Sequence, residues 1–333
     1  MFRAENVFIG RAPSIIKHLQ QVQRDNNETY RTAFDQVGLR KEHLIFPVFV
    51  SDRQGSINSM PGMSIVPVEK VTDYIETIAG AGLSSIIVFG IPKTRDSDGS
   101  MAAVSNGIVQ QAVKAIKSGF GSSINVTTDV CVCQYNLSGH CGILRNGRVD
   151  NDATLDMLTE IAKSHAEAGA DVVAPSSMMD GQVHAIRNAL HDSGFEAKIL
   201  SYSAKHASSL YTPFRSAAFA KARLQIDKSS YQVSFANKRQ VMMEIETDIN
   251  EGADMVMIKP ALAYLDLVRM AKDRFGFPIA VQNVSGEYAM IKAAAMQGWI
   301  HEEEWKVCSI ASIRRAGADR IISYFSLDVA KHL

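Results

Sequence analysis

The sequence of 333 residues is short of cysteine, of long apolar runs and of any excess charge. Lys and Arg together number 35, and so do Asp and Glu. The chain therefore has no excess of basic residues that would bind a polyanion, and nucleic-acid binding has little support. No stretch approaches the roughly 18 consecutive apolar residues of a membrane span. The first thirty residues lack the apolar core of a signal peptide, but they do not exclude an organellar transit segment. Four cysteines in so long a chain do not make a secreted disulfide framework, and we expect a cytoplasmic protein.

Eight short apolar runs alternate with longer amphipathic stretches. Because the runs are apolar on both faces, they are typical of buried parallel strands. They cover residues 43–50, 84–91, 124–130, 171–176, 198–203, 254–260, 278–285 and 320–325. Helical patterns such as 153–170 and 236–253 lie between them. The alternation predicts an α/β protein with a (β/α)8 barrel, and an eight-stranded doubly wound sheet is the structural alternative.

The chain shows no linker that would divide the barrel. Residues 1–40 are more polar and irregular, and they predict an N-terminal arm. Residues 41–333 then form one barrel domain that carries the catalytic groups. The stretch near 208–232 is long for a loop between a strand and a helix, so it is a candidate lid.

Two lysines follow neighbouring strands of the predicted barrel. Lys259 closes the apolar run 255–258, and Lys205 follows the fifth run, where it shares a face with Ser201 and Ser203 if the strand stays extended. Side chains at strand ends emerge at the C-terminal mouth, where catalytic groups of barrels lie. Burial lowers the pKa of a lysine and leaves a neutral amine, which can form a Schiff base with a ketone. The alternative is a pair of snorkelling or anion-binding lysines.

Three of the four cysteines stand in the segment DVCVCQYNLSGHCG, residues 129–142. Asp129, Cys131 and Cys133 point the same way in an extended chain, and the following loop can return Cys141 to them. A structural zinc site usually has four ligands and a second cysteine pair, which this segment lacks. Three thiolates leave one coordination position open, which is the pattern of a catalytic metal site. The alternative is three reduced, buried thiols.

Taken together, these segments resemble the porphobilinogen synthase (5-aminolevulinate dehydratase) family. The resemblance runs from about residue 43 to the C-terminus. Its landmarks include SMPGM (59–63), the cysteine segment, APSSMMDGQV (174–183), SYSAKHAS (201–208), YTPFR (211–215), MIKPALAYLD (257–266) and VSGEYAMIKAAA (284–295). It implies a barrel with an arm that helps to build a homo-oligomer, commonly an octamer. It also implies the condensation of two molecules of 5-aminolevulinate to porphobilinogen with loss of two waters, in heme biosynthesis.

The resemblance assigns roles to residues. Lys259 and Lys205 are expected to hold the two substrate ketones as Schiff bases, and Asp129 and Ser176 to orient an amino group. The cysteine trio, Cys131, Cys133 and Cys141, resembles the catalytic zinc site of metal-dependent members. The residues expected to bind substrate carboxylates or to form the aromatic wall are Arg215, Lys228, Gln232, Ser285, Tyr324, Tyr211 and Phe214. Glu244 matches the glutamate linked to allosteric magnesium, which makes Mg²⁺ a second candidate ion.

The sequence departs from the family pattern at several of these positions. Lys228 stands where many members have Arg, and Ser177 where Asp is common. Ser230 replaces a cysteine of the second zinc site of animal enzymes, so no second zinc is expected. Gln282 and Asn283 replace the usual Tyr-Gln before VSGEY.

Two other functions would use parts of the same pattern. A class I aldolase would explain one reactive lysine but has no evident use for three cysteines. A metal-storage or structural protein on a barrel would explain the cysteines, but the two lysines at strand ends argue against it.

Overall fold

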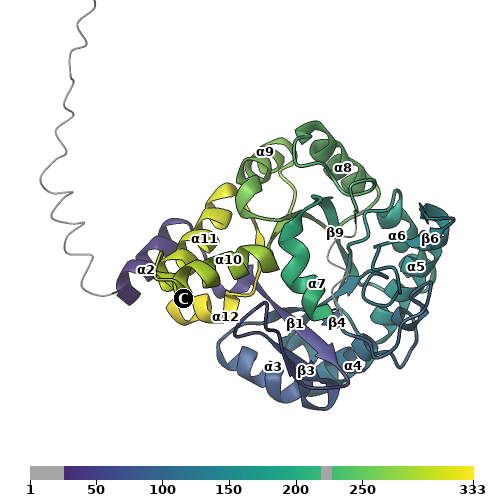
Figure 1. Ribbon diagram of the computed structural model, residues 1–333, viewed down its shortest axis with the longest axis horizontal. Helices are drawn as coiled ribbons and strands as arrows, with labels where there is room; N and C mark the ends of the chain where they lie inside the picture. The colour runs from purple at the N-terminus through teal and green to yellow at the C-terminus, as the bar shows by residue number, and fades with distance from the viewer. Residues whose placement is uncertain (1–25, 219–226) are drawn as a thin grey trace, which may run out of the picture.

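The computed structural model describes residues 26–218 and 227–333, and eight parallel strands ringed by helices lie at its centre (Figure 1). Each strand coincides with one of the predicted apolar runs, within a few residues at its ends. The barrel strands are β1 (Leu44–Ser51), β4 (Ser85–Gly90), β5 (Asn125–Val130), β8 (Val172–Pro175), β9 (Lys198–Lys205), β10 (Met255–Lys259), β11 (Ile279–Asn283) and β12 (Arg320–Ser323).

The sheet formed by these strands closes on itself. Neighbours follow chain order from β1 to β12, and Leu44 and Ile45 of β1 pair in parallel with Ile321 and Ile322 of β12. A doubly wound sheet would leave two open edges, so the closure excludes that alternative. The predicted (β/α)8 barrel is confirmed.

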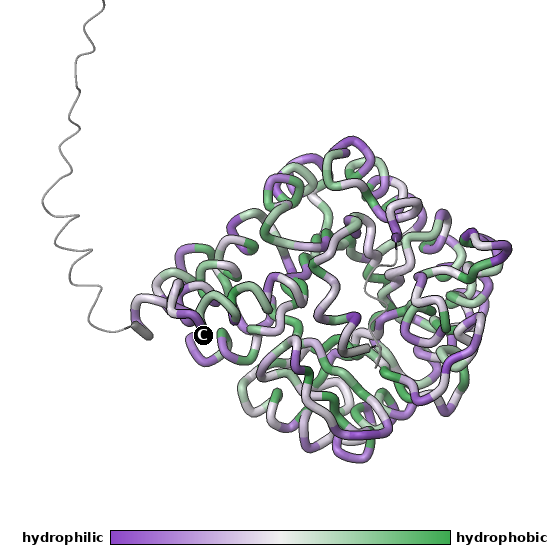
Figure 2. The backbone as a smooth tube through the Cα atoms, viewed as in Figure 1, coloured by the Kyte–Doolittle hydropathy of each residue, from purple (hydrophilic) through white to green (hydrophobic). Residues whose placement is uncertain are grey.

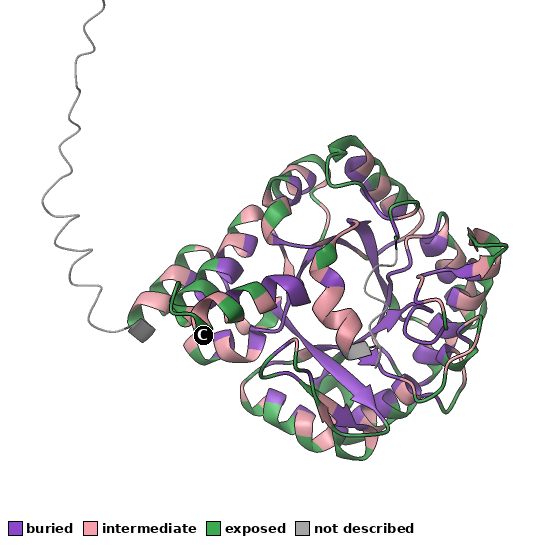
Figure 3. Ribbon diagram, in the orientation of Figure 1, coloured by how far each residue is buried: buried purple, intermediate pink, exposed green. Residues whose placement is uncertain are grey.

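The strands are apolar on both faces because both faces are buried. Every residue of β1 and β11 is buried, and the strands stand out as buried ribbons in Figure 3. Hydrophilic segments gather at the outer rim of the molecule in Figure 2, while apolar segments follow the strands and the inner sides of the helices. One face of each strand thus fills the barrel and the other packs on a helix.

The helices of the barrel layer lie outside the strands. They are α3 (Val71–Gly80), α4 (Ile108–Phe120), α5 (Asn151–Glu167), α6 (Gln182–Asp192), α8 (Lys238–Asn250), α9 (Leu265–Phe275), α10 (Ser285–Met296) and α11 (Glu302–Ala316). The predicted helices 153–170 and 236–253 correspond to α5 and α8, and each ends shortly before Gly169 or Gly252. Both glycines have φ near 100°, a backbone conformation that other residues rarely adopt. No helix in the described ranges is long and apolar enough to cross a membrane.

Shorter elements lie at the barrel mouth and in the connections between the main strands and helices. They are β2 (Gly55–Ser56), β3 (Ser64–Pro67), the hairpin of β6 (Ile143–Arg145) and β7 (Arg148–Asp150), α7 (Thr212–Ala218) and α12 (Ser326–Val329). The 3-10 turns are η2 (Lys41–His43), η3 (Val68–Lys70), η4 (Ser100–Ala102), η5 (Gly121–Ser123), η6 (Ser209–Tyr211), η7 (Leu262–Tyr264) and η8 (Ala330–His332). In Figure 1, α7 lies across the centre of the barrel.

The predicted arm and lid are described in part. Of the arm, α2 (Asn26–Gln36) packs beside α11, and Phe34 and Leu39 are buried there. Residues 1–25 lie outside the described residues, and the domain boundary at residue 40 stays a prediction. The candidate lid is described over 208–218 and 227–232, whereas its residues 219–226 also lie outside the described ranges.

Strand β9 is irregular, so the expectation that Ser201, Ser203 and Lys205 share one face is wrong. Val256 pairs with Ser201 but Ile258 pairs with Ala204, which means that β9 carries one extra residue, a β-bulge. Ser201 therefore points outward and its Oγ donates to Asp248 of α8 (2.6 Å). Lys205 points into the barrel mouth.

Candidate active site

A cavity lies at the C-terminal mouth of the barrel, beneath α7. Apart from Asp129 and Ser176, every residue predicted to react with or bind substrate lines it. The lining is Cys133, Cys141, Lys205, Tyr211, Phe214, Arg215, Lys228, Gln232, Lys259, Gln282, Val284, Ser285 and Tyr324. No Asp or Glu of the described residues belongs to this lining. The cavity is therefore a buried space with an excess of positive charge.

Lys259 ends β10 and faces aromatic rings. Its Nζ lies 5.1 Å from the ring centre of Tyr202, 5.2 Å from that of Tyr211 and 6.0 Å from that of Phe214. Burial, and after it the positive charge of Lys205, lower the pKa of Lys259 to about 7. The amine is therefore neutral in a large fraction of molecules at neutral pH, as a nucleophile requires.

Lys205 is the register partner of Lys259 but has different surroundings. Its Nζ donates to the carbonyl oxygen of Ser176 and lies 3.7 Å from Sγ of Cys141. Burial by itself would lower the pKa of Lys205, but the negative charge of Cys141 and its neighbours raises that pKa above its usual value. The lowered pKa that the sequence predicts for a buried lysine is therefore found for Lys259 and not for Lys205.

Three buried cysteines form a cluster beside the two lysines. The Sγ atoms of Cys131, Cys133 and Cys141 all lie within 4.8 Å of one another, and the three are the one such group of His, Cys, Asp or Glu in the described ranges. The regular strand ends at Val130, so a turn rather than an extended chain brings Cys131 and Cys133 together. Ser177 donates to Sγ of Cys131 (3.4 Å).

The cluster concentrates negative charge on one sulfur. Burial raises the pKa of Cys131 to about 11, and hydrogen bonding with Cys131 raises the pKa of Cys133. Cys141 receives hydrogen bonds from the other two thiols and faces Lys205 and Lys228, and these contacts lower its pKa. Because a metal–thiolate bond is about 2.3 Å long, one ion can reach all three sulfurs. The donor set fits a thiolate-bound metal.

Asp129 and Ser176 lie outside the cavity lining but close to the two lysines that belong to it. The carboxylate of Asp129 accepts a hydrogen bond from Nε2 of Gln134 (2.9 Å) and is almost fully buried. Ser176 is more deeply buried than Asp129, and its backbone carbonyl accepts a hydrogen bond from Lys205. Both residues are thus next to the lysine and cysteine groups, although the proposed contact with an amino group stays a prediction.

Three of the predicted substrate-binding residues pack on aromatic rings. The ring of Phe214 packs on Phe89 (5.2 Å between ring centres), and Tyr324 stacks on Phe49 (6.1 Å). The guanidinium of Arg215 lies 5.8 Å from the ring centre of Tyr211.

The remaining three predicted substrate-binding residues differ in how well their polar groups are paired. Lys228 Nζ lies 3.1 Å from Sγ of Cys141, so in this structure it contacts the cysteine cluster. Oγ of Ser285 accepts from the backbone of Phe214 (3.1 Å) and donates to Leu210 O (3.2 Å). Both polar atoms of the Gln232 amide are buried without a partner among the described residues.

Some residues of the site carried no signal in the sequence. Tyr202 lies beneath both lysines because of the bulge in β9, which no residue pattern predicts. The hydroxyl of Tyr231 accepts from the backbone N–H of Cys141 (3.2 Å) and contacts Nδ1 of His140 (3.1 Å). Tyr231 is 90 residues away in the sequence, so only the fold could reveal that it packs on the cluster.

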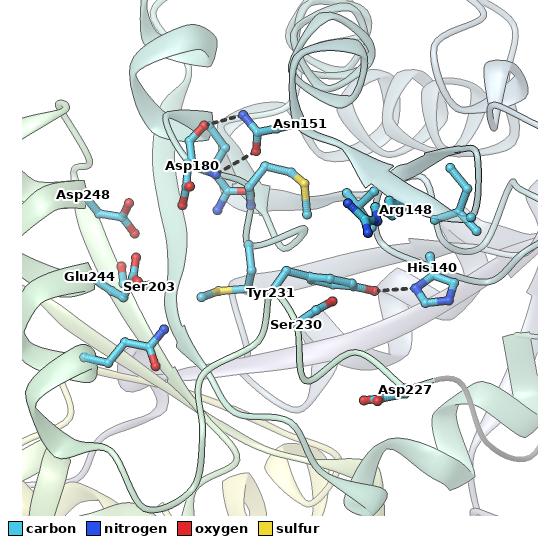
Figure 4. A pocket seen from close by; sticks show the side chains of 17 residues that line it. His140, Arg148, Asn151, Asp180, Ser203, Asp227, Ser230, Tyr231, Glu244 and Asp248 are labelled. Atoms are coloured by element: carbon cyan, nitrogen blue, oxygen red, sulfur yellow. Dashed lines mark hydrogen bonds between the residues drawn. The ribbon is translucent and has the colours of Figure 1, made fainter.

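Glu244 lies in a second cavity, of about 580 Å³, which Tyr231 also lines (Figure 4). Asp180 and Asp248 line the same cavity, and burial raises the pKa of Glu244. Figure 4 shows the carboxylates of Glu244 and Asp248 on one side of this cavity and His140 with Tyr231 on the other. Glu244 belongs to no group of three close metal-ligand atoms among the described residues. Magnesium binding by Glu244 stays a prediction.

Known proteins match this chain over nearly all of its length. The family model described as delta-aminolevulinic acid dehydratase matches residues 19–332. The delta-aminolevulinic acid dehydratase of Archaeoglobus fulgidus is 46% identical over 94% of this chain and 98% of its own length. That of Methanothermus sociabilis is 47% identical over 92% and 96%. A crystal structure of the Toxoplasma gondii porphobilinogen synthase in complex with the product porphobilinogen superposes with a TM-score of 0.86 and 34% identity, covering 97% of this chain and 91% of that one.

The fold, the site and these matches define a (β/α)8-barrel enzyme of the lyase class. More particularly, the chain belongs to the delta-aminolevulinic acid dehydratase family, whose other name is porphobilinogen synthase.

Proposed function

We propose that this enzyme condenses two molecules of 5-aminolevulinate into porphobilinogen, with the loss of two waters. The observation that carries the proposal is the pair of buried lysines, Lys205 and Lys259, at the mouth of the barrel beside a cluster of three thiols. The named relatives and the product-bound Toxoplasma gondii structure support the same reaction.

Lys259 is proposed to start the chemistry as a nucleophile. Its pKa of about 7 provides the neutral amine that adds to the ketone carbon of one substrate, and loss of water then gives a Schiff base. The rings of Tyr202 and Tyr211 exclude water from this bond, which would otherwise hydrolyse. Lys205 is proposed to hold the second substrate ketone in the same way, after it gives up the proton that the thiolates stabilise.

The cysteine cluster is proposed to hold a catalytic zinc ion through Cys131, Cys133 and Cys141. Zinc suits three thiolates with one open position, where it would act as a Lewis acid toward a bound amine or water. The ammonium groups of Lys205 and Lys228, 3.7 Å and 3.1 Å from Sγ of Cys141, balance the negative charge of the thiolates. Ser177 steadies Cys131 by donating to its sulfur.

The two described ends of the lid segment are proposed to bind substrate carboxylates. Arg215 and Lys228 bring positive charge to the cavity from opposite ends of this segment, and Gln232 offers an amide that has no partner in the described part of the chain. Charge-assisted hydrogen bonds to a carboxylate are stronger than neutral ones. None of the described residues that line the cavity carries a carboxylate that would compete with that of the substrate.

The enzyme is further proposed to work as a homo-oligomer. Met290 and Met296 of α10 and Trp299 after it are more than half exposed, which is costly for a surface that stays in water. Sedimentation velocity would test this, and the variant Trp299→Ser is expected to shift the protein toward smaller species. A monomer in the unaltered protein would contradict it.

Borohydride trapping tests the proposed reaction. After reduction in the presence of 5-aminolevulinate, mass mapping is expected to find the label on Lys259. A colour assay for porphobilinogen separates this function from that of a class I aldolase, which would also be trapped but would form no pyrrole. Labelling at other residues only, in an active preparation, would contradict the assignment of Lys259.

A further inference from the structure

Gln282 is a buried polar side chain in the active-site cavity whose hydrogen bonds are incomplete. Its side chain is 1% exposed, and Oε1 has no partner among the described residues. Buried polar atoms are paired in the great majority of cases, because leaving one unpaired is unfavourable. An unpaired amide in a cavity is therefore a sign that a ligand completes it.

The strand register places Gln282 beside the reactive lysine. Ile258 of β10 pairs with Val281 of β11, so the next residues along, Lys259 and Gln282, lie side by side at the mouth. On the other edge, Gln282 pairs with Ile322 of β12, two residues before Tyr324. Gln282 thus lies between Lys259 and Tyr324, and all three line the cavity.

The polar neighbours of Gln282 in the chain are engaged within the protein or lie outside the cavity lining. Ser285 Oγ bonds to the backbone of Phe214 and Leu210. Asn283 accepts a hydrogen bond from Ser323 Oγ (3.0 Å), and its Nδ2 has no partner among the described residues, but Asn283 is not one of the residues that line the cavity. The Gln282 amide, like the Gln232 amide in the same cavity lining, is therefore a group whose hydrogen bonds a ligand can complete without breaking a contact between described residues.

We propose that Gln282 binds the carboxylate of the keto acid that Lys259 holds and so selects keto acids over uncharged ketones. The inference rests on the proposed function of Lys259. Rotating the Gln282 amide by about 180° exchanges Oε1 and Nε2. The position that has no partner can then hold Nε2, whose N–H donates to the ligand. The cavity around it carries positive charge and no described carboxylate, which favours an anionic partner over an amine.

Comparing two ligands, each trapped on Lys259 by borohydride reduction, tests the proposal. Borohydride reduction is carried out with 4-oxopentanoate, which has a ketone and a carboxylate, and with 2-pentanone, which has the ketone alone. In Gln282→Met we expect half-maximal labelling by 4-oxopentanoate to need at least about tenfold more ligand, the effect of one hydrogen bond to a charged group. Labelling by 2-pentanone should not change. An equal response of the two ligands would overturn the proposal.

A matched variant separates binding from folding. Gln110 is a buried amide on α4 whose Nε2 donates to both Ala102 O and Ser164 Oγ (both 2.8 Å). Gln110→Met should lower the melting temperature and leave the ligand ratio unchanged, whereas Gln282→Met should keep or raise the melting temperature. If Gln282→Met does not fold, Gln282→Glu provides the test, because its charge repels the keto acid and not the ketone.

The same experiment distinguishes failure of this inference from failure of the proposed function. No labelling of Lys259 in the unaltered enzyme by either ligand would overturn both. Labelling of the unaltered enzyme with an unchanged preference in Gln282→Met and Gln282→Glu would overturn only the role of Gln282.

Discussion

Lys205 and Lys259 are directly paired across β9 and β10, yet their pKa values move in opposite directions. Lys259 faces aromatic rings, whereas Lys205 faces the thiolate of Cys141. One member of the pair is therefore ready as a neutral amine, and the other stays charged until its surroundings change. The order of the two proposed Schiff bases follows from this difference, with Lys259 reacting first.

The pH dependence of trapping at Lys259 should reflect its lowered pKa. Because only the neutral amine attacks a ketone, labelling by 4-oxopentanoate is expected to rise through about pH 7 and to level off above it. The measurement is the initial labelling rate at Lys259 between pH 5.5 and 9. An increase that begins only above about pH 9 would mean an ordinary lysine.

Removing the charge of Lys205 should raise the pKa of Lys259. Lys205 is the second cause of the lowering after burial, so the midpoint of labelling in Lys205→Met is expected at higher pH than in the unaltered enzyme. Lys163→Met, on the exposed side of α5, serves as the control and should keep the original midpoint. An unchanged midpoint in Lys205→Met would show that the two ammonium groups do not interact.

The cysteine cluster should determine how much metal the protein holds. Cys133→Ser removes one of three ligands, so purified protein is expected to lose most of its zinc, measured by elemental analysis per chain. The matched control is Cys308→Ser, because Cys308 is exposed and far from the cluster in the sequence. Equal zinc content in both variants would place the metal elsewhere.

His165 should make folding sensitive to acid. It is buried on α5, neither ring nitrogen has a partner among the described residues, and burial lowers its pKa to about 3. The unfolded chain binds a proton near pH 6.5, so the free energy of unfolding falls as the pH drops from about 6.5 toward 3, by about 3 kcal/mol at pH 4. Urea unfolding at pH 7 and pH 4 should show this loss, and His165→Leu should lose less. His191→Leu, at an exposed site, should behave like the unaltered protein.

Glu287 should hold two strand ends of the active site together. Its buried carboxylate accepts the backbone N–H groups of Ala261 (3.1 Å), Leu262 (2.5 Å) and Val284 (2.6 Å). Glu287→Ala leaves these donors unpaired, so the free energy of unfolding is expected to fall by roughly 3 kcal/mol or more. Glu304→Ala, at an exposed position of α11, is the control for losing a carboxylate. Equal stability of the two variants would contradict this account.

The barrel could be predicted because burial on both faces leaves a direct mark in the sequence. A strand such as β1 must be apolar throughout, and the residues that follow such strands must meet at one mouth. Lys259 and the cysteine segment could be singled out for the same reason. The identity of the family came from the longer motifs rather than from these patterns.

The local geometry of the site could not be predicted. The bulge in β9 depends on how the strand fits its neighbours, and it decides that Ser201 faces Asp248 while Lys205 faces the cavity. The contacts of Lys228 and Tyr231 with Cys141 join residues about 90 positions apart. Such contacts follow from the folded path of the chain and leave no periodic signal.

The bulge in β9 also has a consequence for changes in chain length. In a strand without it, Tyr202 and Lys205 would project to opposite sides, because they are three positions apart. Removing one residue between them would restore strict alternation with both side chains still aimed inward. Adding one between them would also give an even separation, so in a regular strand the two side chains would again project to the same side. The inward aim of both side chains at their present separation of three therefore depends on the bulge itself. A change that abolished the bulge without altering the number of residues should turn the ammonium toward the helices.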